Sequence, residues 1–137
     1  MSAKYLLDSW AVLAYLKKES PADLRVLRLL EKARDGEAQL FLSVINLGEI
    51  YYIVGRARGE ETAQYILDEI KKLPIEILHV EEKDVLAAAA WKMKRPMAYA
   101  DAFAASAAQE LQAILLTGDP ELLALRDLIE IEILERS

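Results

Sequence analysis

Four acidic side chains have the type and placement needed for metal-dependent chemistry: Asp8, Glu49, Asp101 and Asp119. Two carboxylates about 4 Å apart repel by about 4 kcal/mol at an effective dielectric constant near 20. A pocket that gathered all four would therefore need a cation. Ligand sets made only of oxygen favour hard ions such as Mg²⁺ or Mn²⁺ and disfavour Zn²⁺. Such an ion at an open site suits the hydrolysis of phosphate esters.

Glu49 carries most of this argument. The residues three and four positions away on its predicted helix are mainly apolar, and Asn46 is the strongly polar one among them. A carboxylate on that face is at least partly desolvated and needs a partner. No Lys or Arg occurs from Ser43 through Gly55, so Glu49 has no local cation and is a candidate metal ligand.

The other three acids also have structural interpretations that the sequence leaves open. Asp8 follows a predicted strand and could cap a helix, a frequent role of aspartate. Asp119 precedes Pro120 and is placed as an N-cap in the same way. Asp101, in the first turn of a helix, would complement the helix dipole.

The apolar pattern predicts alternating strands and helices, and therefore an α/β sandwich with a mainly parallel central sheet. Functional sites in such sheets form at the carboxyl ends of the strands, where Asp8, Glu49 and Asp119 are expected. Asp101 lies in the first turn of the helix that precedes the expected strand Ala113–Leu116. The expected strands are Lys4–Leu7, Gln39–Leu42, Ile75–Val80, Ala113–Leu116 and Ile129–Leu134. The expected helices run from Ser9 to Lys18, Pro21 to Arg34, Ser43 to Val54 with Gly55 closing it, Glu60 to Lys72, Glu81 to Lys94 and Tyr99 to Leu111, with a short one after Pro120.

Composition limits the possible functions. Residues 1–137 are expected to form a single domain, since 54% of them are apolar and can supply a core. With no cysteine, disulfides, thiolate metal sites and cysteine nucleophiles are excluded. His79 is the only histidine, so polyhistidine zinc sites are excluded, and it is expected to be structural. The sequence contains no glycine-rich phosphate-binding loop, so no nucleotide cofactor is expected. No apolar run is long enough to span a membrane, so no transmembrane helix is expected. A cytoplasmic protein is expected.

Four segments together resemble the PIN-domain family, and within it the VapC-type toxins. They occur in the family's order and cover nearly the whole chain: Leu7-Asp8-Ser9, Ser43-Val-Ile-Asn46-Leu-Gly-Glu49, Tyr99-Ala-Asp101-Ala-Phe and Leu116-Thr117-Gly118-Asp119. The resemblance implies a PIN-like three-layer α/β/α sandwich.

The resemblance also implies a metal-dependent endoribonuclease that uses Mg²⁺ or Mn²⁺. In that interpretation Asp8 and Asp101 hold the ion with Glu49 close by, and Asp119 binds a second ion or orients water. The ion-activated water then cleaves RNA to leave 5′-phosphate and 3′-hydroxyl ends. Supporting hydroxyl or amide positions are Ser9, Asn46 and Thr117, and at Asn46 many relatives carry Thr or Ser.

VapC-like proteins form homodimers and pair with a cognate VapB-like antitoxin, so both partners are expected here. Two alternatives to a toxin remain. One is a PIN nuclease that acts in RNA maturation or flap processing. The other is a PIN module that binds metal or protein without catalysis, which the complete set of four acids disfavours.

Several cations could guide RNA toward the acids, although the chain as a whole is acidic, with 17 Lys and Arg against 23 Asp and Glu and a net charge of −6. The candidates are Lys92, Lys94 and Arg95 before Asp101, and Arg56 and Arg58 around a glycine-bounded turn. Solvated helix ends explain the same residues without RNA. The aromatic residues Trp10, Tyr15, Tyr51 and Tyr52 could stack on bases, but packing in a core or dimer is the simpler expectation.

Overall fold

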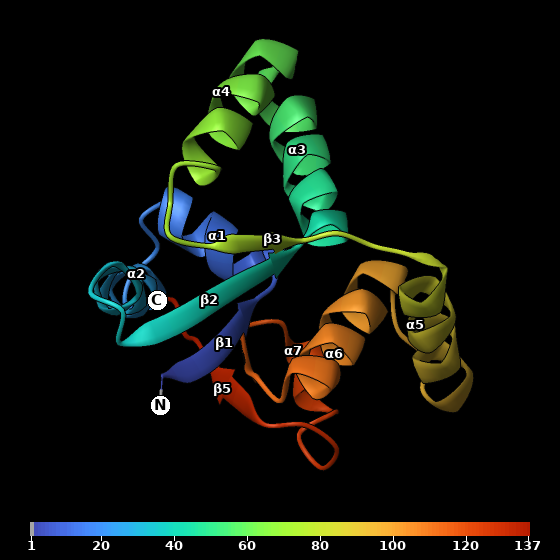
Figure 1. Ribbon diagram of the computed structural model, residues 1–137. Helices are drawn as coiled ribbons and strands as arrows, with labels where there is room; N and C mark the ends of the chain where they lie inside the picture. Colours follow the sequence, from blue (N-terminus) through green and yellow to red (C-terminus); the bar gives the residue numbers. More distant parts are fainter. Residues whose placement is uncertain (1) are drawn as a thin grey trace.

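A computed structural model describes residues 2–137, which form a five-stranded parallel sheet covered by helices on both faces (Figure 1). The strand order is β3-β2-β1-β4-β5. Every neighbouring pair is parallel, as the alternation of strands and helices predicted. The strands are β1 (Ala3–Leu7), β2 (Ala38–Ser43), β3 (Glu76–Leu78), β4 (Ile114–Thr117) and β5 (Ile131–Ile133).

The helices follow the strands in the order expected for a parallel sheet. They are α1 (Ser9–Leu16), α2 (Ala22–Arg34), α3 (Val44–Arg58), α4 (Glu60–Ile70), α5 (Glu82–Lys94), α6 (Tyr99–Leu111) and the short α7 (Pro120–Leu123). Figure 1 shows α1 to α4 on one side of the sheet and α5 to α7 on the other, with α3 and α4 projecting as a pair. No helix in the described part of the chain has the length and apolar character needed to cross a bilayer.

The two faces of the sheet build two separate cores, because successive side chains of a strand point to opposite faces. Leu7 packs with the helices α1 to α4. Its neighbour Leu6 packs with the helices α5 to α7. The same alternation separates Leu115 from Leu116 on β4, so three layers form and the predicted α/β/α sandwich is confirmed.

Strand register and capping place polar residues together at the carboxyl edge of the sheet. Leu7 at the end of β1 is paired with Leu42 on one side and Leu116 on the other. The residues that follow these positions, Asp8, Ser43 and Thr117, therefore lie side by side at one edge. Asp8 and Ser43 also accept hydrogen bonds as the N-caps of α1 and α3.

Helix α6 brings a further acid to this edge because its buried face is made almost entirely of alanine. Ala102, Ala104, Ala105 and Ala108 are each at most 1% exposed. Small side chains allow a helix to approach a sheet closely. Asp101, in the first turn of α6, is thereby held beside the ends of the strands.

The predicted end of α3 at Gly55 is wrong. The helix continues through Gly55 to Arg58 and ends at Gly59, whose φ of +93° favours glycine. Gly55 serves packing instead: a Cβ there would lie 3.7 Å from the Cβ of Ala63 on α4. The longer helix carries both Arg56 and Arg58 in its last turn.

Candidate metal centre and active site

All four predicted acids line one small pocket at the carboxyl edge of the sheet. The pocket has a volume of about 180 Å³. Residues from α1, α3, α6 and the β4–α7 loop form its walls: Asp8, Ser9, Trp10, Leu13, Asn46, Glu49, Ile53, Asp101 and Asp119. Parallel strands that end together account for this convergence of residues far apart in the sequence. We call this cavity the acid pocket.

Asp8 is buried with only 3% of its surface exposed, and both of its carboxylate oxygens have protein donors. One oxygen accepts a hydrogen bond from the backbone nitrogen of Ala11 at 2.9 Å, which is the predicted cap of α1. The other accepts from the hydroxyl of Thr117. Burial is the main cause that raises the Asp8 pKa to about 7; the charges of Asp101 and Asp119 act in the same direction, and the two hydrogen bonds oppose it. Asp8 therefore caps α1 and lines the acid pocket at the same time.

A second network joins α1 to α3 and fixes Glu49. The hydroxyl of Ser9 donates to Oε1 of Glu49. Nδ2 of Asn46 donates to the same hydroxyl oxygen at 3.2 Å. Because a hydroxyl has one proton and a carboxylate is the stronger acceptor, this arrangement orients all three side chains.

Asn46 is only 1% exposed, and its Oδ1 has no hydrogen-bond partner. A buried acceptor without a donor costs about 1–3 kcal/mol. Nδ2 is held by Ser9, so the amide cannot exchange its two ends without breaking that bond. The side chain belongs to the lining of the acid pocket, and a donor or a cation there would satisfy its oxygen.

Asp101 and Asp119 line the acid pocket and also lie close to Glu121, a residue outside the pocket lining that the sequence pattern did not single out. One carboxylate oxygen from each of the three lies within 4.8 Å of the others. Partial burial, together with the charges of Asp119, Glu49 and Glu121, raises the Asp101 pKa to about 6. Asp119 also caps α7, accepting from the Glu121 nitrogen at 2.9 Å. The only sequence signal for Glu121 was its place two residues after Asp119.

No basic side chain neutralises these acids within residues 2–137. The four ion pairs of that region join other carboxylates, for example Arg25 to Glu132 and Arg95 to Asp127. The donor set of the pocket is therefore all oxygen, negatively charged and free of histidine and cysteine. This chemistry, together with the unsatisfied oxygen of Asn46, fits a hard divalent cation.

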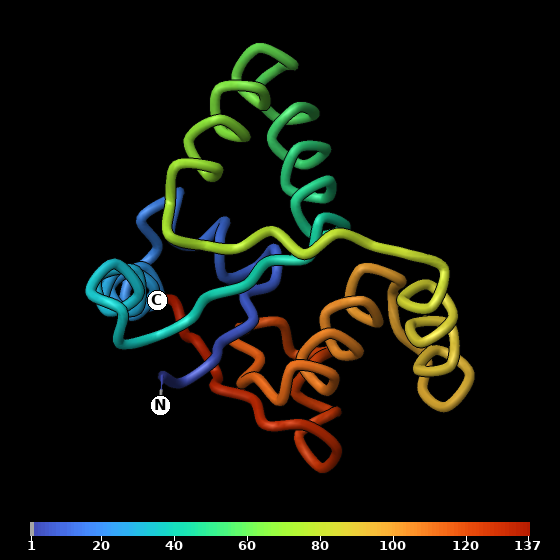
Figure 2. Tube along the Cα trace, in the orientation of Figure 1, coloured from blue at the N-terminus to red at the C-terminus, as the bar shows by residue number. Residues whose placement is uncertain are grey.

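Trp10 forms one wall of the acid pocket and lies against the loop that carries Asp119. A Cβ built on Gly118 would overlap the six-membered ring of Trp10, so only glycine allows this approach. The guanidinium of Arg136 lies 5.1 Å from the ring centroid of Trp10. Leu134 donates to the carbonyl of Thr117 at 2.8 Å, and Figure 2 shows these last residues passing close to α2. The C-terminal segment thus supports β4, whose Thr117 donates a hydrogen bond to Asp8.

The predicted RNA-contacting cations have different surroundings. Arg95 binds both carboxylate oxygens of Asp127 and the carbonyl of Ala124. Lys92 donates to the carbonyl of Met97. Arg56 contacts Tyr52, whereas Lys94 and Arg58 are exposed and take part in none of the ion pairs of residues 2–137.

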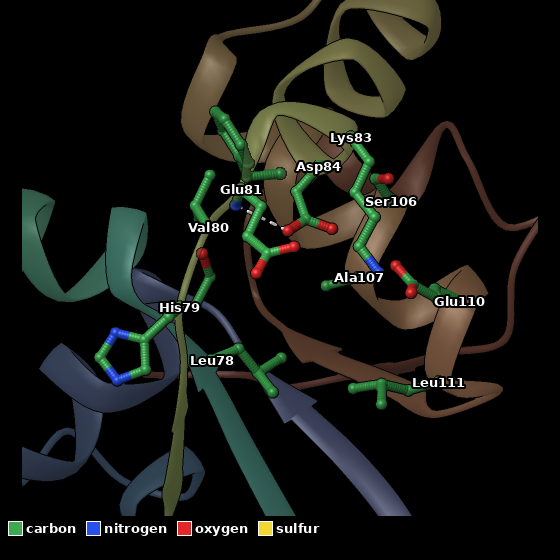
Figure 3. A pocket seen from close by; sticks show the side chains of 12 residues that line it. Leu78, His79, Val80, Glu81, Lys83, Asp84, Ser106, Ala107, Glu110 and Leu111 are labelled. Carbon is green, nitrogen blue, oxygen red and sulfur yellow. Dashed lines mark hydrogen bonds between the residues drawn. The ribbon is translucent and has the colours of Figure 1, made fainter.

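His79 lies in another pocket, of about 280 Å³, between β3, α5 and α6 (Figure 3). Its imidazole points away from the side chains of Glu81 and Asp84 (Figure 3). Asp84 accepts from the Glu81 nitrogen at 2.9 Å and so caps α5. None of the four predicted acids lines this pocket, which makes the acid pocket the better candidate for the active site.

Known proteins support the fold that surrounds this pocket. The VapBC2 structure from Rickettsia felis, bound to a promoter DNA fragment, is 20% identical with a TM-score of 0.75, over 96% of this chain and 99% of that one. VapC20 of Mycobacterium tuberculosis, described as a toxin that cleaves the sarcin-ricin loop, is 16% identical with a TM-score of 0.68, over 88% and 93%.

PAE2754 from Pyrobaculum aerophilum is 17% identical with a TM-score of 0.65, over 96% and 92%. No curated protein sequence matches the chain significantly. The PIN domain family model matches residues 5–128, a stretch that contains all four acids of the pocket. The chain therefore belongs to the PIN-domain family.

Proposed function

We propose that this protein is a metal-dependent endoribonuclease and the toxin of a type II toxin–antitoxin pair. The observation that carries the proposal is the acid pocket: four acids of a PIN domain line one cavity, and no cation of residues 2–137 pairs with them. A phosphodiester could approach so negative a pocket only after its charge is balanced.

Asp8, Asp101 and Glu49 would hold Mg²⁺ or Mn²⁺, with Asp119 and Glu121 at the outer side. A bound ion of this kind supplies Lewis-acid stabilisation of charge on the phosphate and lowers the pKa of water. The protein's own contribution is orientation. Thr117 and Ala11 fix the Asp8 carboxylate, and Ser9 fixes Glu49. Because both acids are fixed before the ion binds, little side-chain entropy is lost on binding.

The proposal includes two protein partners. Several structural neighbours are toxin–antitoxin complexes, among them VapBC-1 from Haemophilus influenzae and a complex from Klebsiella pneumoniae. An antitoxin segment that presents an arginine to the acid pocket would neutralise the same charges that the ion balances. We further propose a homodimer of this chain, and action in the cytoplasm, where RNA and the antitoxin are made.

The test is cleavage of a single-stranded RNA by the purified chain with EDTA, Mg²⁺ or Mn²⁺. We expect cleavage only with a divalent ion, products with 5′-phosphate and 3′-hydroxyl ends, and loss of cleavage in Asp101→Asn. Mn²⁺ should also raise the melting temperature of the wild-type chain and raise it less in Asp101→Asn. Cleavage that persists in EDTA, or in Asp101→Asn, would remove the acid pocket from the reaction.

A further inference from the structure

Arg56 combines an unneutralised charge with a favourable position among the predicted RNA-contacting cations. Arg95 is already bound to Asp127, and Lys92 to a backbone carbonyl. Arg56 takes part in none of the ion pairs found within residues 2–137. Its guanidinium therefore retains its positive charge for a ligand.

The position of Arg56 on α3 aligns it with the acid pocket. At roughly 3.6 residues per turn, Arg56 lies about 10 Å along the helix from Glu49 and about 20° around its axis. Ile53, one turn beyond Glu49, lines the acid pocket and lies between them. Arg58, two residues later, lies about 180° from Glu49 and so on the opposite side of α3.

Tyr52 adds an aromatic surface beside this charge. Its side chain is 57% exposed, although it is a large hydrophobic residue. Its hydroxyl accepts a hydrogen bond from Nη1 of Arg56 at 3.0 Å, and the guanidinium carbon lies 5.7 Å from its ring centroid. A shallow depression lined by Tyr51, Tyr52, Gly55, Arg56 and Glu60 surrounds the two side chains.

We propose that the Tyr52–Arg56 pair is a binding subsite for single-stranded RNA next to the acid pocket. Arg56 contacts a backbone phosphate of the strand that enters or leaves the pocket, and the ring of Tyr52 stacks on a neighbouring base. An aromatic ring beside a cation is the combination that holds unpaired nucleic acid. The pocket and the net charge of −6 repel RNA, so a nearby positive subsite is needed to retain the strand. This inference rests on the proposed function.

The experiment compares Arg56→Ala with Arg58→Ala, because the two variants remove the same charge from the last turn of the same helix. Both cations interact with the C-terminal end of the helix dipole, so their effects on stability should be similar. Binding is measured by fluorescence anisotropy with an end-labelled single-stranded RNA of mixed sequence, in the Asp101→Asn background. Cleavage kinetics are measured in the otherwise wild-type chain.

We expect Arg56→Ala to weaken RNA binding and to reduce the slope of log affinity against log salt by about 0.7, the value for one phosphate contact on a single strand. In cleavage it should raise KM with little change in kcat, and Arg58→Ala should resemble the wild type. Tyr52→Ala should weaken binding about fivefold or more, whereas Tyr52→Phe, which keeps the ring, should lose much less.

Equal effects of Arg56→Ala and Arg58→Ala in a chain that cleaves RNA would overturn this inference alone. Loss of antitoxin binding by Arg56→Ala with unchanged RNA binding would overturn it as well, because the surface would then serve a protein partner. A wild-type chain that neither binds nor cleaves RNA would overturn the proposed function and this inference together.

Discussion

Two regions of this protein place carboxylates beside the sheet, and they differ in whether a cation is paired with those carboxylates. At the outer strand β5, Glu132 receives two hydrogen bonds from Arg25, at 2.6 and 2.9 Å. The guanidinium also lies 5.8 Å from the ring centroid of Tyr5. At the acid pocket several carboxylates converge, and no cation of residues 2–137 is paired with them.

The difference is between a carboxylate that is already paired and carboxylates that remain available to a ligand. A carboxylate with a bidentate arginine contributes modestly to stability and has little capacity left for a ligand. Carboxylates that are buried together without a cation oppose folding, and burial raises the pKa of Asp8 and Asp101. Unfavourable charge retained in a folded protein is typical of a site that binds a cation.

The largest expected effect is on RNA cleavage, which should depend on the acid pocket and not on Glu132. Asp8→Asn should lower kcat for RNA cleavage by about 100-fold or more, because the neutral amide cannot balance a divalent ion. Asparagine still accepts at the N-cap of α1, so the fold should remain. Glu132→Gln should leave cleavage unchanged. The measurements are cleavage of end-labelled RNA and circular dichroism, and an active Asp8→Asn chain would contradict the assignment.

Gly118→Ala should destabilise the protein by about 1–3 kcal/mol, because the new methyl group would overlap the ring of Trp10. Gly48→Ala is the matched control: a Cβ there meets nothing within 4 Å, and the residue lies within α3 beside Glu49. The control should be neutral or slightly stabilising. Urea unfolding measures both variants. Equal stabilities of the two would show that the Trp10 contact can relax.

The pH dependence of stability should reveal the raised pKa of Asp8 in the acid pocket. The native Asp8 pKa is about 7 against an ordinary value of 3.8, so between these limits the folded state binds more protons than the unfolded state. The ion-free protein should therefore lose at least about 1 kcal/mol of unfolding free energy as the pH rises from about 4 to 8.

Thermal unfolding in EDTA across this range measures the effect. Asp8→Asn should make the profile less steep, because the substituted side chain does not titrate and only the raised pKa of Asp101 still contributes. A wild-type chain that becomes more stable as the pH rises through this window would contradict the raised pKa.

The smallest expected effect concerns the paired acid. Glu132→Gln should cost about 1 kcal/mol or less, because both partners are about one-third exposed and water screens their attraction. Glu69→Gln is the control, since its pair with Lys72 is on the surface, and it should have no measurable effect. Urea unfolding compares the two. A larger cost for Glu132→Gln than for Gly118→Ala would mean that the ion pair matters more than the packing of the pocket wall.

Much of this organisation could be predicted from the sequence because local rules determine it. Apolar periodicity predicted the strands and helices, and the preference of sites for the carboxyl edge placed Asp8, Glu49 and Asp119 there. Asp101 was added to them by the resemblance to the PIN-domain family, and it lines the same pocket. Gly55 misled because a glycine that ends a helix and one that allows two helices to approach look the same in sequence. Only the contact with Ala63 on α4 distinguishes them.

Other features depend on side chains that meet across the fold and leave no local trace. The bidentate pair of Arg95 with Asp127 joins residues far apart in sequence. The sequence therefore did not show that Arg95 is already paired and less available to RNA. Glu121 was missed because nothing in the local sequence shows that its carboxylate approaches Asp101, 20 residues earlier in the chain. The unsatisfied oxygen of Asn46 likewise appears only when every donor around it is known.

The hydrogen bond from Thr117 to Asp8 closes a loop of 109 residues, and this separation has a consequence for biosynthesis. A ribosome adds Thr117 as the 109th residue after Asp8, so a nascent polypeptide that has not yet reached β4 lacks the hydroxyl that orders this acid. Until β4 and the loop after it are made, the growing chain also lacks Asp119, and the acid pocket is incomplete.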